Sequence, residues 1–347
     1  MPNKFFKKGL VLGIIVLFVG LSVTSSNANF SNVNISTNDE MSSISMDNMG
    51  IIYVDDDNTE GPWDGTMAHP YQYIQDAVDE ATDGDTVFVY SGTYSHHYPQ
   101  NRGCVDIIKK NINLIGENKH TTIIDATNEL GIIHVDAPKV SISGFTLQYS
   151  DNFGIELGFN YVQRITINDN ILSGCKGEGA IVIWMGENRI YNNFISNSTT
   201  GVLIGGGNNN IYNNQITKNS EGIHIFENVL TGIDHNLISL NKYGIVIENC
   251  RIKIRFNNFI QNLNQATFSN YLLVPLGRNK WLYNYWDDWE KTIPRPIKGE
   301  WAFYLFIFKD IIFIGPFPSY EYDLYPASKP NPCEIPDTSF IYGCGIE

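Results

Sequence analysis

The chain has 347 residues, and 37 Asp and Glu against 23 Lys and Arg give it a formal net charge of −14 at pH 7. An acidic chain repels polyanions, so this balance argues against nucleic acids and anionic membrane surfaces as partners.

Residues 1–28 have the composition of a secretory signal peptide. Lys4, Lys7 and Lys8 precede an apolar stretch from Gly9 to Val23, and small residues stand at the −3 and −1 positions of a cleavage site after Ala28. The apolar stretch is short for a membrane span, so only an uncleaved signal would hold the chain at a membrane. Residues 29–50 are polar and rich in Asn and Ser, which predicts a flexible linker. We therefore expect an exported protein that is extracellular, on the cell surface or periplasmic.

Residues 51–103 are expected to form an N-terminal cap and the first strands. A strand from Ile51 leads into an acidic turn, and an amphipathic helix over residues 71–81 precedes a strand over 83–94. A helix at this position would cover the open end of a solenoid, which must be shielded from water. The turn carries Asp55, Asp57, Glu60 and Asp64, hard oxygen ligands that suit calcium; a solvated acidic turn is the alternative.

Residues 104–289 carry a repeat of about 22 residues, with the phrase Asn-x-Ile-x-x-Asn-apolar-Ile clearest at 188–195 and 209–216. A glycine before an apolar pair keeps the same step, at Gly179, Gly201, Gly222 and Gly244. The short alternating runs predict strands rather than helices. Three short strands in each repeat predict an all-β fold, a right-handed single-stranded parallel β-helix whose coils rise ~4.8 Å each.

The second asparagine of each repeat has a structural interpretation. These residues are Asn170, Asn193, Asn214, Asn236 and Asn258. Asparagine tolerates the positive φ that a corner between strands requires, and amides stacked at one corner can pass hydrogen bonds along a ladder. We predict a structural ladder rather than a row of ligands.

The C-terminal residues 290–347 are expected to form a β cap. The apolar stretch from Trp301 to Gly315 carries Lys309 and Asp310 at its centre, which favours two short strands or a hairpin over a membrane span. Cys333 and Cys344 could form a disulfide in an exported protein.

Several segments resemble a known family. Tyr53-Val-Asp-Asp-Asp-Asn, His69-Pro-Tyr-Gln-Tyr-Ile-Gln-Asp-Ala-Val and the closing Leu282-Tyr-Asn-Tyr-Trp-Asp-Asp-Trp289 resemble exported proteins of the pectin-lyase-like superfamily, and within it the NosD-type β-helix group. The resemblance covers about residues 51–289. It implies the parallel β-helix fold, whereas the superfamily spans lyases, hydrolases and binding proteins, so that it leaves the chemistry open.

Catalytic motifs of that superfamily are sparse in this sequence. Of the four motifs of the galacturonan hydrolases, Arg251-Ile-Lys253 alone occurs. The row before the asparagines holds Asp169 and His235 but no second carboxylate of the kind that glycoside hydrolysis requires. Arg251, Lys253, Asp169 and His235 are therefore weak catalytic candidates.

An outward row two residues after each glycine contains Glu156, Ile181, Leu203, His224 and Val246, with Trp184, Phe226 and Tyr243 nearby. It would form either a sugar-stacking groove or the floor beneath a loop. We predict an exported β-helix that binds carbohydrate or acts as a surface scaffold, and we expect a binding protein rather than an enzyme. The alternatives are a polysaccharide lyase or glycoside hydrolase acting on acidic glycans, with calcium as a candidate cofactor, and the copper handling that the NosD resemblance implies.

Overall fold

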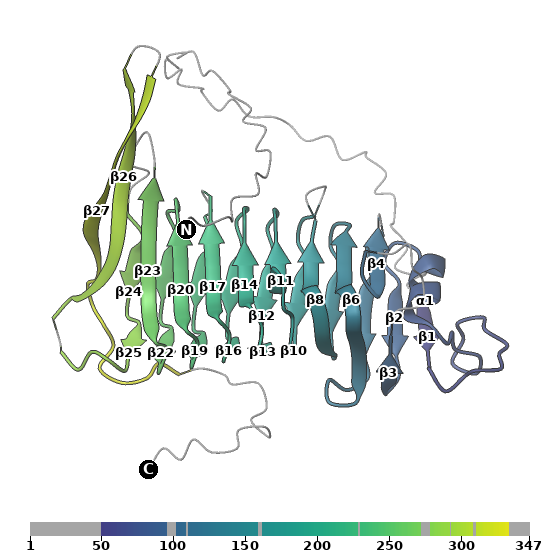
Figure 1. Ribbon diagram of the computed structural model, residues 1–347. Helices are drawn as coiled ribbons and strands as arrows, with labels where there is room; N and C mark the ends of the chain where they lie inside the picture. The colour runs from purple at the N-terminus through teal and green to yellow at the C-terminus, as the bar shows by residue number, and fades with distance from the viewer. Residues whose placement is uncertain are drawn as a thin grey trace, which may run out of the picture. The chain divides into compact units, whose positions relative to one another are not determined.

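The computed structural model describes residues 50–95, 102–108, 110–158, 162–227, 230–271, 278–291, 293–307 and 310–332. The predicted signal peptide, nearly all of the predicted linker, and Cys333 and Cys344 lie outside these residues. The described chain is nearly all-β and forms a parallel β-helix of about eight coils, as predicted (Figure 1).

Each full coil contributes one strand to each of three parallel sheets. Sheet 1 contains β1 (Ile51–Val54), β2 (Thr86–Val89), β5 (Asn113–Gly116), β7 (Ser141–Ser143), β9 (Thr166–Asn168), β12 (Arg189–Tyr191), β15 (Asn210–Tyr212), β18 (Gly232–Asp234), β21 (Lys253–Arg255) and β24 (Lys280–Leu282).

Sheet 2 contains β3 (Gly92–Tyr94), the first parts of β6 (Thr122–Asp136) and β8 (Thr146–Leu157), β10 (Ile171–Ser173), β13 (Phe194–Ser196), β16 (Gln215–Thr217), β19 (Leu237–Ser239), β22 (Asn258–Ile260) and β25 (Tyr285–Trp286). Sheet 3 contains β4 (Val105–Ile108), the last parts of β6 and β8, β11 (Gly179–Ile183), β14 (Thr200–Ile204), β17 (Glu221–Phe226), β20 (Tyr243–Glu248), β23 (Asn264–Tyr271) and β26 (Arg295–Ile307).

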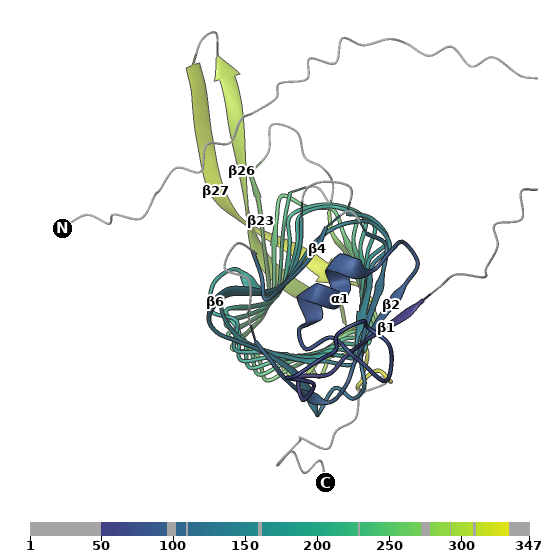
Figure 2. The same ribbon diagram turned by 90° about the vertical axis from the view of Figure 1, so that its right-hand side faces the viewer.

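The core is a set of stacked apolar columns inside the coils. In sheet 1, for example, Ile190, Ile211, Ile233 and Ile254 pair in register and are fully buried. The single helix of the described residues, α1 (Ile74–Glu80), buries Ile74, Ala77 and Val78 and lies across the first open end of the coils (Figure 2). It begins three residues later than predicted because Tyr71 instead forms a parallel bridge with Val54.

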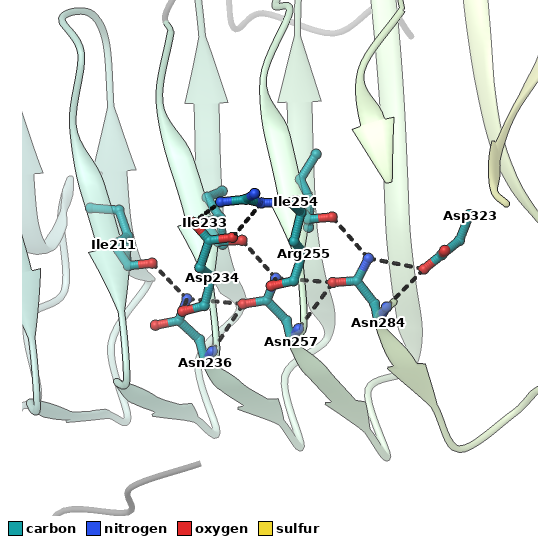
Figure 3. A network of polar contacts seen from close by, with 9 residues as sticks. All are labelled: Ile211, Ile233, Asp234, Asn236, Ile254, Arg255, Asn257, Asn284 and Asp323. Atoms are coloured by element: carbon teal, nitrogen blue, oxygen red, sulfur yellow. Dashed lines mark hydrogen bonds and ion pairs between the residues drawn. The ribbon is translucent and has the colours of Figure 1, made fainter. Parts of the chain in front are cut away.

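An asparagine ladder runs along the corner between sheets 1 and 2. Asn193 donates from its backbone N and from Nδ2 to Oδ1 of Asn214, at 3.0 Å in both cases, and Asn214 bonds Asn236 in the same way. From Asn236 the ladder continues through Asn257 and Asn284 to the carboxylate of Asp323 (Figure 3). A second carboxylate, Glu321, ends the corner between sheets 3 and 1 by accepting from Asn279 and Trp281.

Two details of the ladder prediction were wrong. Asn258 is not a member of the ladder. The coil that follows Asn236 is one residue shorter than the 22 residues expected, so Asn257 takes the ladder position. Asn258 instead bonds the backbone of Asn331. The positive φ also does not fall on the ladder asparagines. It falls on the residue before each, with φ of 55–56° at Asp169, His235 and Phe256, so the ladder side chains are free to turn inward and bond.

The C-terminal β cap is a long hairpin of β26 and β27 (Asp310–Asp323). Its base belongs to the solenoid, since Gly299–Ala302 pairs with β23 and Asp323 pairs with Trp281. Beyond Ala302 the two strands, among the described residues, pair only with each other, and the hairpin extends past the outline of the coils (Figure 2). The prediction of short strands packed over the last coil therefore describes the base of the hairpin and not its outer half.

Candidate functional site

The outer surface of sheet 3 carries a group of interacting polar and aromatic side chains. The register places Glu156, Val182, Leu203 and His224 side by side on successive coils. Val182 replaces Ile181 of the predicted row, because Ile181 pairs with the inward residues Ile155 and Val202. We call the outer surface from β6 to β23 the sheet-3 face.

At the N-terminal side of this face, the buried carboxylate of Glu156 holds three side chains from separate segments. Arg102 donates to both carboxylate oxygens through Nε and Nη2, and Trp184 Nε1 donates to Oε1 at 3.0 Å. His134 Nδ1 lies 3.1 Å from Oε2. The Glu156 side chain is 2% exposed whereas that of Arg102 is 49% exposed. Glu156 is thus an internal anchor that fixes the groups presented to solvent.

Two carboxyl groups in this region have pKa values shifted in opposite directions. Burial alone would raise the pKa of Glu156, but hydrogen bonds from His134, Trp184 and Arg102 outweigh it and hold the pKa below the usual value. Burial, and then the charge of Glu156, raise the pKa of Glu178. A charged carboxylate and a carboxyl group that retains its proton more readily are the pairing found in acid–base sites.

An aromatic bridge occupies the middle of the face. Trp184 and Phe226 stand on either side of Gly205 and meet edge to face, with ring centroids 6.2 Å apart. A Cβ at Gly205 would lie 3.0 Å from Trp184 and 3.3 Å from Phe226, so this position needs glycine for the rings to lean over the coil between them. Because its indole N–H is bonded to Glu156, the Trp184 ring is held in one orientation.

His224 forms a second charged cluster beyond the bridge. Its Nδ1 lies 2.8 Å from Glu221 and its Nε2 lies 3.7 Å from Glu248, while its ring contacts Phe226. Burial alone would lower the pKa of His224, but the close contact with Glu221 and the negative charge of Glu248 raise it to about 9. An imidazolium cation therefore persists on this face at neutral pH.

The face ends in a groove of about 400 Å³ at the foot of the hairpin, with Val246, Glu248 and Thr267 on one side and Lys298, Glu300 and Pro318 on the other. Glu248 joins this groove to the His224 cluster. From β8 to β23 the polar and aromatic surface spans five coil steps, or ~24 Å at the inter-strand spacing. A surface of this shape can hold an extended ligand with many hydroxyl groups and apolar ring faces.

The catalytic candidates from the sequence lie elsewhere. Arg251 lies two residues before β21, the strand of sheet 1 that begins at Lys253, and Asp169 and His235 occupy the left-handed corner between sheets 1 and 2. They share one side of the solenoid but do not meet the Glu156 cluster. Arg102 and His134 had no sequence signal, because they come from segments outside the regular repeat, and Glu178 was missed although it directly precedes the repeat glycine Gly179.

Two carboxylates of the acidic turn, Asp55 and Asp64, accept hydrogen bonds from neighbouring residues of the same turn. Asp64 accepts from the backbone and hydroxyl of Thr66 and contacts His69, and these bonds lower its pKa to about 2. Asp55 accepts from the backbone of Asp57, which is exposed like Glu60. Within the described ranges, no three His, Cys, Asp or Glu side chains are grouped to hold a metal ion. Cys104, Cys175 and Cys250 are separately buried thiols, so the described residues do not fit a copper ion either.

Comparison with known proteins supports the fold. The family model described as periplasmic copper-binding protein (NosD) matches residues 78–290. Pectate lyase Pel9A has a similar structure, with a TM-score of 0.51 and 15% identity over 68% of this chain and 74% of that one. The A-module of the Azotobacter vinelandii mannuronan C-5 epimerase AlgE4 gives a TM-score of 0.47 and 14% identity over 67% of this chain and 78% of that one. A search of curated proteins found no significant match.

No helix of the described residues is long and apolar enough to cross a membrane.

Proposed function

Because the chain belongs to the family of periplasmic copper-binding proteins (NosD), we propose that it is an exported β-helix protein of the periplasm or cell surface, and that its sheet-3 face binds carbohydrate. The observation that supports the binding proposal is the sequence of features along that face. A charged cluster at Glu156, an aromatic bridge at Trp184 and Phe226, and a second charged cluster at His224 follow one another on neighbouring coils.

This arrangement matches the two requirements of sugar recognition. Aromatic rings offer large apolar surface at little cost in conformational entropy, and sugars present apolar ring faces to them. The charged groups on both sides of the rings supply donors and acceptors for hydroxyl groups. Since Glu156 already orients Arg102 and Trp184 in the free protein, little ordering is required when a ligand binds.

The test is a titration of the purified chain with a panel of oligosaccharides, both neutral and uronate-containing, followed by tryptophan fluorescence and calorimetry. We expect at least one oligosaccharide to bind, and Trp184→Ala to weaken it by on the order of tenfold or more, a loss typical of a central aromatic contact. Trp63→Ala is the matched control, because Trp63 is 48% exposed in the N-terminal turn, away from sheet 3. Equal losses in the two variants, or no binding by any sugar, would overturn the proposal.

A polysaccharide lyase or hydrolase is the second candidate function, favoured by the opposed pKa shifts of Glu156 and Glu178. We expect no turnover of polygalacturonate or alginate with or without calcium. Release of unsaturated product or of reducing ends that disappears in Glu178→Gln would establish an enzyme with its site on the sheet-3 face. Loss in Arg251→Ala or Lys253→Ala instead would move the site to sheet 1.

Copper handling rests on the family description, and calcium on the acidic turn. Met41, Met46 and Met49, soft ligands for copper(I), lie outside the described residues. Competition with a chromophoric copper(I) chelator tests this function directly. Stoichiometric binding that is lost when the three methionines become leucines would place copper on the linker and leave the sheet-3 proposal untouched.

A further inference from the structure

The outer surface of sheet 1 is basic, although the chain as a whole is acidic. Apart from Arg278, six exposed lysines and arginines lie on this surface or two residues before one of its strands. They are Lys139, Arg164, Arg189, Arg251, Lys253 and Lys280. We call the surface from β7 to β24, together with these leading residues, the basic face.

These cations are unpaired within the part of the chain that the structure describes. None of the six takes part in an ion pair there, whereas other cations of the protein do, such as Arg102 with Glu156 and Arg295 with Asp288. Of the carboxylates on the same face, Asp169 accepts from the Asn168 amide and Asp234 is bound to Arg255. Glu187 is exposed. In a chain with a net charge of −14, a face with this excess of free cations is a site of attraction for an anion.

The cations follow the axis of the solenoid. Arg189, Asn210, Gly232, Lys253 and Lys280 are neighbours in register on five successive strands. Four coil steps separate Arg189 from Lys280, or ~19 Å at the inter-strand spacing. The charges thus form a narrow strip and not a broad patch.

A groove runs along the same strip. One part, of about 320 Å³, is lined by Arg164, Glu187, Arg189 and Asn210, and the next, of about 590 Å³, by Asn210, Tyr212, Arg255 and Phe256. Asn210 lines both parts, so they adjoin each other on the basic face.

The groove has a rigid floor and wall. Arg255 binds both carboxylate oxygens of Asp234, at 2.9 and 3.2 Å, directly above the asparagine ladder (Figure 3). His235, Phe256 and Tyr283 stack in a column beside it, with centroids 5.0 and 5.2 Å apart. These residues take left-handed backbone conformations that set the direction of each ring.

We propose that the basic face is a second binding site, distinct from the sheet-3 face, and that its ligand is a linear anionic polysaccharide. A linear polymer fits because the cations and the stacked rings both follow the solenoid axis over several coils, and the two hollows lie beside them. A bilayer surface would instead require a wide patch with apolar side chains able to enter it. The site also exists whatever the sheet-3 face binds, since no residue is shared between the two.

The test measures binding of polygalacturonate and of dextran sulfate, with neutral dextran as the uncharged control, over a range of salt concentrations. Arg189→Gln/Lys253→Gln removes two charges from the basic face, and both side chains are exposed, so the fold is kept. The matched control Lys218→Gln/Lys242→Gln removes two exposed charges from the corner between sheets 2 and 3. We expect the first variant to reduce the slope of log K against log salt by about two, one for each cation lost, and the control to leave it unchanged.

Three outcomes would overturn the proposal. The control variant could weaken binding as much as the basic-face variant, which would indicate general electrostatic attraction without a site. A second such outcome is that neither polyanion binds the wild type. Anionic vesicles or single-stranded DNA could bind more tightly than both polysaccharides, which would identify another class of ligand. Trp184→Ala keeps the two sites separable, since it should leave binding at the basic face unchanged.

Discussion

Replacement of Asn214 by alanine tests whether the ladder holds the coils together. The Asn214 side chain makes five hydrogen bonds within 3.1 Å: it accepts from the backbone and Nδ2 of Asn193, and it donates to Ile190 O, Tyr212 O and Asn236 Oδ1. Asn193, Ile190 and Asn236 are fully buried at the corner, so water cannot replace the missing partner there without opening it. At a net ~0.5–1.5 kcal/mol for each of the five bonds, the substitution should cost roughly 3 kcal/mol or more.

The cost should be visible as a fall in the thermal midpoint. At about 2–4 °C for each kcal/mol in a chain of this size, we expect a decrease of roughly 6 °C or more, measured by calorimetry or circular dichroism. Asn210→Ala is the control: Asn210 lies in the same coil, is exposed, and makes no side-chain hydrogen bond to the rest of the described chain. A decrease for Asn214→Ala no larger than that of the control would refute the ladder as a source of stability.

Three further predictions concern the ends of the chain and its pH response. Truncation after Trp289 removes Glu321 and Asp323, which end two corners of the solenoid. We expect light scattering to show aggregation of the truncated chain, whereas deletion of residues 29–50 should leave the protein monodisperse. A monodisperse truncated chain would contradict this prediction. The pKa of His224 is raised to about 9, so the stabilisation that protonated His224 contributes is complete below pH ~6.5 and is lost as the pH rises through 9. At ~1.36 kcal/mol per pKa unit, this stabilisation is at most about 3 kcal/mol. The His224→Gln variant should lack the corresponding part of the fall in thermal midpoint between about pH 6 and 10. If the acidic turn binds calcium, a chelator should lower the melting temperature of the wild type but not of Asp57→Asn, and identical melts with calcium and with chelator would exclude the site.

The coils could be predicted because the same local requirement recurs in each of them. An inward isoleucine, an outward residue, a left-handed residue and an inward asparagine follow one another at Ile190–Asn193 and again at Ile211–Asn214. Counting from the inward Ile254 by this rule leads to Asn257, whereas counting 22 residues from Asn236 leads to Asn258. The rule based on the direction of side chains is the better guide because it follows the geometry of the corner and tolerates coils of unequal length.

The polar site on sheet 3 could not be predicted in the same way. Glu156 and His224 belong to the repeat and were visible as outward positions, but Arg102 and His134 come from irregular coils near the N-terminal end. Their meeting depends on the register of β4, β6 and β8, which includes shifts between Asp125 and Gly131. No spacing in the sequence records such shifts.

The asparagine ladder has a direction, and this bears on how the length of the protein can change. Every member donates to the side-chain oxygen of the next member on its C-terminal side, and Asp323 closes the series with a carboxylate acceptor in place of an amide. A duplicated coil placed between Asn193 and Asn236 would find an acceptor on one side and a donor on the other, so both ends would remain as they are. A coil added after Asp323 would follow a carboxylate side chain, which has no N–H to donate to the next ladder residue. Gain or loss of coils during evolution should therefore have occurred in the interior of the repeat, with the two caps inherited intact.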